Sequence, residues 1–77
     1  MKIKVKILGV LKKPEGKSIF QLELPDGAKL TDIYERLNYT KLEASFVVPA
    51  VNGKVKKPSH TLSENDEVLL SMTVGGG

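Results

Sequence analysis

Hydrophobic and polar residues alternate strictly at the start of the chain, which predicts a β-strand with one buried face. Between residues 2 and 7, aliphatic side chains point one way and lysines point the other. A second alternation over 18–24 follows a polar turn at 12–17. Two amphipathic strands joined by a short loop predict an antiparallel hairpin.

The period changes after residue 27, where apolar residues recur at the spacing of a helix. Leu30, Ile33 and Leu37 form one stripe at positions i, i+3 and i+7. Thr31 is placed to cap the start of this helix, and Asn38 is placed to end it in a left-handed conformation. We therefore expect a short helix that covers one face of the sheet.

A second capping signature follows directly. Thr40 and Glu43, three residues apart, predict a further helical turn at 41–45. The apolar segment 45–51 then predicts a strand. Because Pro49 has no N–H to donate, we expect this strand at an edge of the sheet or at a bulge.

The last part of the chain predicts two more strands and the topology. The Asn52-Gly53 pair is typical of a tight hairpin and leads into a brief strand at 54–56, and a final strand spans 67–72. The first and last strands are the most apolar, so we expect them side by side and parallel in the centre. The predicted fold class is α+β, a mixed sheet of four to five strands with one helix packed on one face. We expect the domain at 1–74 and a flexible glycine tail at 75–77.

Composition excludes several classes of chemistry. The 77 residues include no cysteine and one histidine, which excludes disulfides, thiol nucleophiles and cysteine-based metal centres. No apolar run approaches the roughly 20 residues of a membrane span, and the N-terminus lacks the apolar core of a signal peptide. We therefore expect a cytoplasmic protein with no membrane partner.

The charge is basic, but it does not favour a nucleic-acid partner. Twelve Lys and Arg against nine Asp and Glu give a net charge of +3, yet Arg36 is the only arginine and there are four Phe and Tyr residues and no Trp. Nucleic-acid readers commonly use arginine forks and aromatic platforms. The surface lysines fit either steering toward an acidic partner or protection against edge-to-edge aggregation. These lysines are Lys2, Lys4, Lys6, Lys54, Lys56 and Lys57.

No catalytic constellation is visible in the sequence. His60 is the only imidazole, and Ser59 beside it gives a spacing that is not specific for a nucleophile and its base. Glu64, Asp66 and Glu67 lack the glycine and the register of a calcium loop. We expect no metal site.

The most unusual feature is the run of glycines Gly75, Gly76 and Gly77. Glycine adds nothing to a packed core, but its backbone passes through a tunnel that a Cβ would block. A carboxylate on the last glycine would be unhindered and ionised at neutral pH. The pattern therefore favours a tail that enters a narrow site in a partner. The alternative is a frayed terminus or an added cloning remnant.

The residues from Val51 onward resemble a known family. Val51-Asn52-Gly53, then His60-Thr61-Leu62, then 65–68 and the glycine end are typical of the ubiquitin-like (β-grasp) sulfur carriers. These include the small subunits of molybdopterin synthase (MoaD) and the thiamine-pathway carriers (ThiS). Asn65 stands where glycine is common, and the chain ends in three glycines where the family has two. These departures affect the assignment of a cofactor pathway more than they affect the assignment of the fold.

The resemblance implies a carrier and not an enzyme. An E1-like adenylyltransferase would use ATP to adenylate Gly77, or Gly76 if the last residue is trimmed, and the product would become a thiocarboxylate. Thr73, Val74, Gly75 and Gly76 would enter the partner's site. The carrier itself would bind no cofactor. The sulfur would pass to the large subunit of a molybdopterin synthase or to another acceptor enzyme.

Docking of such partners needs an apolar patch beside the tail, and Leu70 and Met72 are the candidates, with Val74 next to them. The alternative is that the side chains of this strand belong to the core, foremost Val68. Three other functions remain open. They are a thiamine-pathway carrier, a ubiquitin-like protein modifier with the same activation, and a non-catalytic β-grasp binding module.

Overall fold

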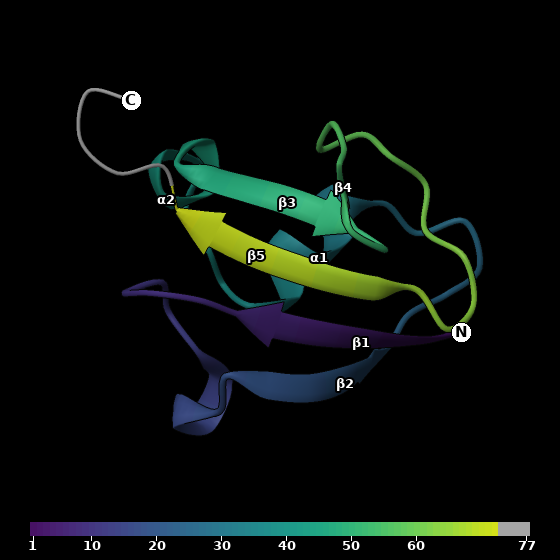
Figure 1. Cartoon of the computed structure of the whole chain (residues 1–77), viewed down its shortest axis with the longest axis horizontal. Helices are drawn as coiled ribbons and strands as arrows, with labels where there is room; N and C mark the ends of the chain where they lie inside the picture. Colours follow the sequence, from purple (N-terminus) through teal and green to yellow (C-terminus); the bar gives the residue numbers. More distant parts are fainter. Residues whose placement is uncertain (73–77) are drawn as a thin grey trace.

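The computed structural model describes residues 1–72, which form a five-stranded sheet, two helices and one 3₁₀ turn (Figure 1). The elements are, in chain order, β1 (Lys2–Ile7), a 3₁₀ turn (Pro14–Gly16), β2 (Ile19–Glu23), α1 (Leu30–Arg36), α2 (Lys41–Ser45), β3 (Val47–Val51), β4 (Lys54–Val55) and β5 (Glu67–Met72).

The sheet is mixed, and its first and last strands lie side by side at the centre as predicted. The strand order is β2-β1-β5-β3-β4. β1 and β5 run parallel, with Val5 opposite Val68, and every other neighbouring pair is antiparallel. This arrangement confirms the α+β class.

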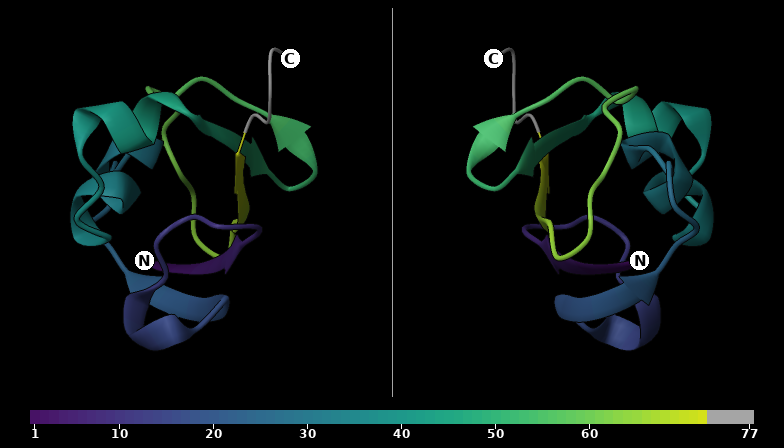
Figure 2. Two further views of the ribbon diagram at one scale, coloured as in Figure 1. Left: turned by 90° about the vertical axis from the view of Figure 1, so that its left-hand side faces the viewer. Right: turned by 90° about the vertical axis from the view of Figure 1, so that its right-hand side faces the viewer.

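The core lies between the sheet and α1. Alternate residues of β1 and β5 point toward the helix, and Figure 2 shows both helices on one side of the sheet. Ile33 of α1 is fully buried against this face. The largest fully buried side chains include Ile3, Ile7, Leu30 and Leu70. The two-layer packing follows from the sequence, because one amphipathic helix can cover only one face of the sheet.

The start of α1 differs from the prediction. Its N-cap is Lys29, and Thr31 lies inside the first turn. The Asp32 carboxylate accepts a hydrogen bond from the Lys29 N–H at 2.7 Å, so an acidic side chain caps the helix from within. Asn38 has a positive φ of 60°, which confirms it as the left-handed stop.

The second helical turn is confirmed with both of its capping bonds. The Thr40 hydroxyl accepts a hydrogen bond from the Glu43 N–H at 3.1 Å, and the Glu43 carboxylate accepts one from the Thr40 N–H at 2.8 Å. The backbone hydrogen bond from Thr40 holds the pKa of Glu43 below its usual value. α2 has no buried residue, so local capping stabilises it more than packing does.

Pro49 lies neither in an edge strand nor at a bulge in the ladder with β5, so the prediction of one or the other is wrong. β3 lies between β5 and β4. The ladder between β3 and β4 covers only Ala50 and Val51, and the Pro49 carbonyl accepts a bond from the Lys56 N–H at 3.1 Å, just beyond β4. The missing N–H of Pro49 would face this same side, where the neighbouring strand has already ended.

Candidate functional site

The candidate site is the surface around the end of β5. Met72 pairs with Val47 at the start of β3. The parallel neighbour β1 ends at the same place, where the Leu8 N–H donates to the Leu70 carbonyl at 2.9 Å. The chain therefore leaves the sheet between the end of β1 and the start of β3. The predicted roles of Thr73, Val74, Gly75, Gly76 and Gly77 lie outside the described residues and stay predictions.

The two predicted docking residues lie in different environments. Leu70 is 0% exposed in the core under α1, so the structure contradicts its role as a docking residue. The alternation that places Val68 and Leu70 toward the helix leaves Leu69 on the other face of the sheet. Met72 follows the same inward register at the end of β5 but is half-buried, and it packs against the margin of the core.

An apolar groove of about 240 Å³ lies beside Met72. Its apolar side chains come from the loop after β1, from α2 and from the residue that ends α2. Val10 is 85% exposed, Leu42 is 68% exposed and Phe46 is 45% exposed. Leu11 and Tyr39 complete its apolar lining.

Polar contacts fix the walls of this groove. The Lys12 ammonium donates to the Asn38 carbonyl at 2.8 Å and lies 3.4 Å from the Glu43 carboxylate. The Tyr39 hydroxyl donates to the Lys12 carbonyl at 2.7 Å. The Tyr39 ring stacks on Tyr34 with a centroid separation of 6.1 Å. The loop after β1 is thus tied to α2 and to the segment between the two helices by one lysine and one tyrosine.

A second apolar hollow lies on the open face of the sheet. It has a volume of about 360 Å³, and its lining includes Leu8, Ile19 and Leu69 together with Lys4 and Lys6. Leu8 is 42% exposed and Ile19 is 54% exposed. The two hollows differ in charge, because Lys12 and Glu43 balance in the first lining, whereas Lys4 and Lys6 exceed the single acidic residue Glu67 in the second.

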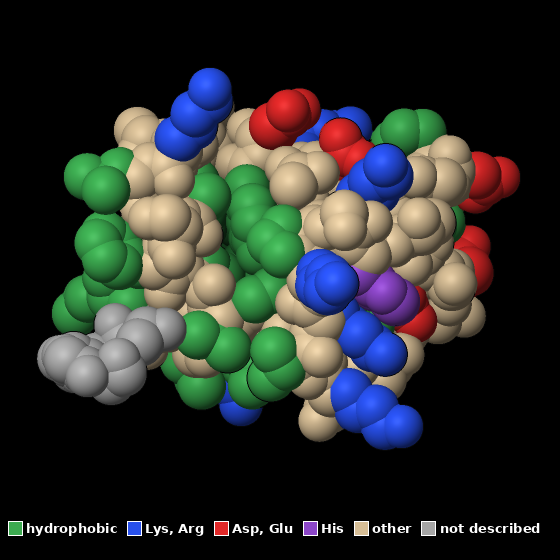
Figure 3. Space-filling model, turned by 90° about the horizontal axis from the view of Figure 1, so that it is seen from above, with side chains coloured by type: hydrophobic (Ala, Val, Ile, Leu, Met, Phe, Trp, Pro, Cys, Tyr) green, Lys and Arg blue, Asp and Glu red, His purple; other side chains and the backbone are tan. Residues whose placement is uncertain are grey.

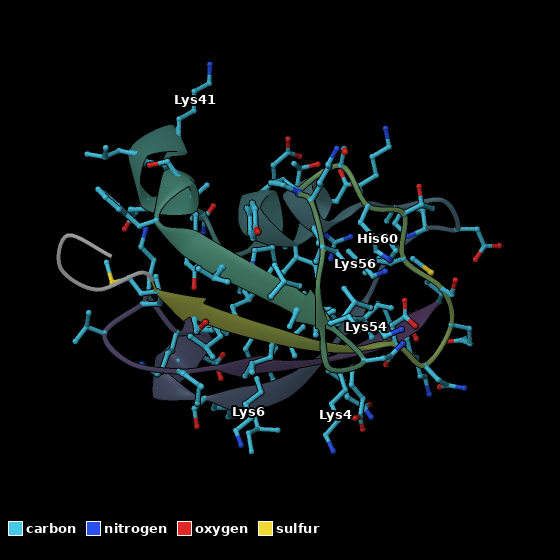
Figure 4. All side chains as sticks on the ribbon, turned by 45° about the horizontal axis from the view of Figure 1, so that its top comes forward. Lys4, Lys6, Lys41, Lys54, Lys56 and His60 are labelled. Carbon is cyan, nitrogen blue, oxygen red and sulfur yellow. The ribbon has the colours of Figure 1, made fainter. Side chains whose placement is uncertain are left out.

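Apolar side chains gather more densely at one end of the molecule than at the other. In Figure 3, hydrophobic side chains gather toward the end where α2 and the end of β5 lie, and the histidine with several Lys or Arg side chains lies on the other half. Figure 4 shows Lys54, Lys56 and His60 near β4 and the loop that follows it. In the same view, Lys4 and Lys6 project from β1.

The motif residues Asn52 and Asp66 have a structural role at the far end of β5. Asn52 has a positive φ of 52°, and its side-chain oxygen accepts from the Glu67 N–H at 3.0 Å. Its amide nitrogen donates to the Asp66 carboxylate at 2.9 Å, and that carboxylate also accepts from the Ser63 N–H at 2.8 Å. The Asp66 carboxylate therefore binds groups within the protein, and its contacts do not support a calcium site. Asn65 has a positive φ of 67°, which explains why it can replace glycine.

Residues 1–72 form no cluster of metal-ligating side chains. The part of the chain that the structure describes holds no group of three His, Asp or Glu side chains placed to bind a metal ion. His60 uses its backbone groups, with its N–H bonded to the Lys57 carbonyl at 2.9 Å and its carbonyl bonded to the Leu30 N–H at 3.1 Å. Within the same residues, no helix is long and apolar enough to cross a membrane.

Comparison with solved structures identifies the class of fold. A protein of Pyrococcus furiosus described as molybdopterin converting factor, subunit 1 is similar at 25% identity, with a TM-score of 0.75 over 95% of this chain and 98% of that one. Small archaeal modifier protein 1 of Haloferax volcanii is similar at 16% identity, with a TM-score of 0.75 over the same shares. A complex of subunits 1 and 2 of molybdopterin-converting factor from Helicobacter pylori contains a chain similar at 20% identity, with a TM-score of 0.66 over the whole of both chains. The fold is the ubiquitin-like β-grasp.

The sequence comparison is more specific. The ThiS family matches residues 5–77, which is nearly the whole chain. The protein therefore belongs to the ThiS family. No curated protein compared with the chain matches it.

Proposed function

We propose that the protein is a sulfur carrier whose C-terminal glycine is activated by an E1-like adenylyltransferase and converted to a thiocarboxylate. The acceptor is an enzyme of cofactor biosynthesis, with molybdopterin as the product and a molybdopterin synthase large subunit as the partner. The carrier is not itself an enzyme. It supplies the reacting group and the surface that partners bind.

The chemistry needs only a carboxylate at the end of the tail. One oxygen of the Gly77 carboxylate, or of Gly76 after trimming, attacks the α-phosphorus of ATP, and pyrophosphate leaves. A sulfide-equivalent nucleophile then attacks the acyl carbon of the adenylate, and AMP leaves with the activated oxygen. The product is a thiocarboxylate. Sulfur transfer to the acceptor then restores the carboxylate when water or an acceptor oxygen replaces the sulfur.

The observation that carries this proposal is the family match, which extends through residue 77. The last described element before that tail is β5, a central strand of the sheet. The strand before the tail is paired with β1 as far as Leu70 and with β3 as far as Met72. A fully extended peptide from 73 to 77 would reach at most about 18 Å beyond that residue. This reach suits delivery of a reactive end into a partner while the domain stays outside.

A reconstituted sulfur-transfer reaction tests the proposal. It contains the carrier, an E1-like enzyme and the acceptor enzyme from the same host, with ATP and a sulfur donor. We expect the chain without Gly76 and Gly77 to transfer no sulfur, while a Val55→Gln chain, changed at the opposite end of the molecule, transfers normally. Transfer by the shortened chain would contradict the proposal.

The family match supports a carrier of either branch, and the similarity to the Pyrococcus protein favours the molybdopterin branch over the thiamine branch. Supplying each acceptor enzyme in turn to the thiocarboxylate form separates the branches. We expect turnover with the molybdopterin acceptor and none with the thiamine acceptor.

A protein-modifier role is the alternative that the fold likeness to small archaeal modifier protein 1 favours. It shares the activation but ends in an isopeptide bond to a lysine of a target. Immunoblotting of host lysate separates the two. A ladder of high-mass conjugates supports the modifier, and free carrier alone supports the sulfur carrier.

A further inference from the structure

The short helix α2 presents its apolar residues to solvent. Leu42 and Phe46 lie four positions apart, which places them on the same side of a helical turn. Helices of globular proteins normally bury such a side against the core. α2 has no buried residue, and these two side chains are 68% and 45% exposed.

These two residues join Val10 and Met72 around the apolar groove described above. The groove is formed in advance of binding, because the Lys12 and Tyr39 contacts already tie its walls together. Exposed apolar side chains scattered singly need no explanation, but a contiguous set around a hollow marks an interaction site.

The position of the groove indicates which partner covers it. Met72 lines the groove and is the residue from which the tail continues. The extended peptide 73–77 spans at most about 18 Å, so a protein that encloses its end must also contact the surface around Met72. The groove is therefore continuous with the interface that the proposed function requires.

Charge separates this groove from the hollow on the open sheet face. Lys12 on its rim is paired with Glu43, which leaves the rim balanced. Lys4, Lys6 and Glu67 line the other hollow, which leaves one positive charge in excess, and within residues 1–72 neither lysine forms an ion pair. The groove suits an apolar side chain, whereas the sheet face suits a partner that also brings acidic groups.

We infer that the groove between α2 and the loop after β1 receives an apolar side chain of the ATP-using enzyme that activates the tail. The inference rests on the proposed function. It assigns Leu42, Phe46 and Val10 as residues that set the affinity of the carrier for this enzyme. They do not touch the reacting atoms, so they act on binding and not on the chemical step.

Steady-state adenylation tests the inference through its separate kinetic constants. Pyrophosphate release is measured against carrier concentration for wild type, Leu42→Gln, Phe46→Gln and the control Val55→Gln, which is changed at a side chain of similar exposure (69%) on β4. We expect KM to rise by about tenfold for each groove variant with kcat unchanged, as for truncation of an interface anchor. Val55→Gln should keep the wild-type KM. Thermal unfolding of each variant confirms that it is folded.

The same assay discriminates between the two faces. Ile19→Gln, on the open sheet face, should leave KM unchanged, and added salt should change the wild-type KM little because the groove contact is apolar. A raised KM for Ile19→Gln together with unchanged values for Leu42→Gln and Phe46→Gln would overturn the groove inference and leave the proposed function standing. A wild-type chain that an active enzyme does not adenylate would overturn both.

Discussion

At the scale of single residues, Tyr34 and Tyr39 form a matched pair with opposite hydrogen-bonding states. The Tyr34 side chain is 5% exposed, and its hydroxyl has no hydrogen-bond partner among the described residues. The Tyr39 hydroxyl donates to the Lys12 carbonyl. A buried hydroxyl without a partner loses its hydration and gains nothing in return.

We therefore predict that Tyr34→Phe and Tyr39→Phe change stability in opposite directions. Removal of the unpartnered hydroxyl should raise the free energy of unfolding by about 1 kcal/mol, and removal of the bonded one should lower it by about 1 kcal/mol. Urea denaturation of both variants beside wild type measures this. A loss at Tyr34→Phe equal to that at Tyr39→Phe would show that the Tyr34 hydroxyl has a partner.

The raised pKa of Tyr34 also predicts that the protein loses stability in alkali. Burial, with a smaller contribution from neighbouring Tyr39, raises its pKa from the usual 10 to about 12. The folded chain thus holds the phenolic proton more tightly than the unfolded chain, so this stabilisation is complete below pH 10 and is lost as pH rises through 12. We expect Tyr34 to lower the unfolding free energy by about 2 to 3 kcal/mol over this range, and Tyr34→Phe to lose that contribution. Burial also raises the pKa of Tyr39, so the part of the alkaline decline that Tyr39 causes should remain in Tyr34→Phe. Denaturation at a series of alkaline pH values, with tyrosinate absorbance recorded in parallel, measures both effects. An identical alkaline decline in the two chains would contradict the assignment.

At the scale of elements, Asn52 joins the turn after β3 to the start of β5. It combines a left-handed backbone with side-chain bonds to Glu67 and Asp66. Asn52→Ala should lower the free energy of unfolding by about 2 kcal/mol, because it loses both bonds and strains the backbone. Asn52→Gly should lose about half as much, since glycine tolerates the positive φ. Chemical denaturation compares them. Equal and small losses in both variants would show that the turn does not depend on this residue.

The elements also show what the sequence could predict. Alternation and helical spacing predicted the long strands and α1, because these strands have one apolar face and α1 has one apolar stripe. The Asn52-Gly53 turn predicted β4, and the Thr40 capping signature predicted α2. Pro49 was predicted at an edge or at a bulge because its missing N–H was visible in the sequence, whereas the early end of β4 was not. Leu70 was offered as a docking residue because sequence shows apolar positions without showing where α1 stops covering the sheet.

The side chains of the groove were missed for a related reason. Val10 lies in a loop without periodicity, and the two exposed residues of α2 give the same pattern as buried ones.

At the scale of the whole molecule, the two ends of β5 have different roles. The end of this strand near Glu67 is fixed by the Asn52 and Asp66 bonds. The other end, at Met72, opens into the apolar groove and leads to the glycines. Two of the motifs that carry the family resemblance therefore lie at opposite ends of one strand, where the first maintains the fold and the second is assigned to chemistry. This separation predicts that Asn52→Gly, although less stable, keeps the wild-type KM for adenylation at a temperature where it is folded.

The most direct test of the central claim is the intact mass of the chain after incubation with ATP, a sulfide source and the E1-like enzyme of the same host. The account predicts a mass gain equal to the exchange of one oxygen for one sulfur, located by fragmentation on Gly77. The same incubation is run on a chain that ends at Gly76, which places the exchange on Gly76 if the last residue is normally trimmed. An unchanged mass in both chains, with an enzyme shown to be active on another carrier, would contradict the sulfur-carrier function.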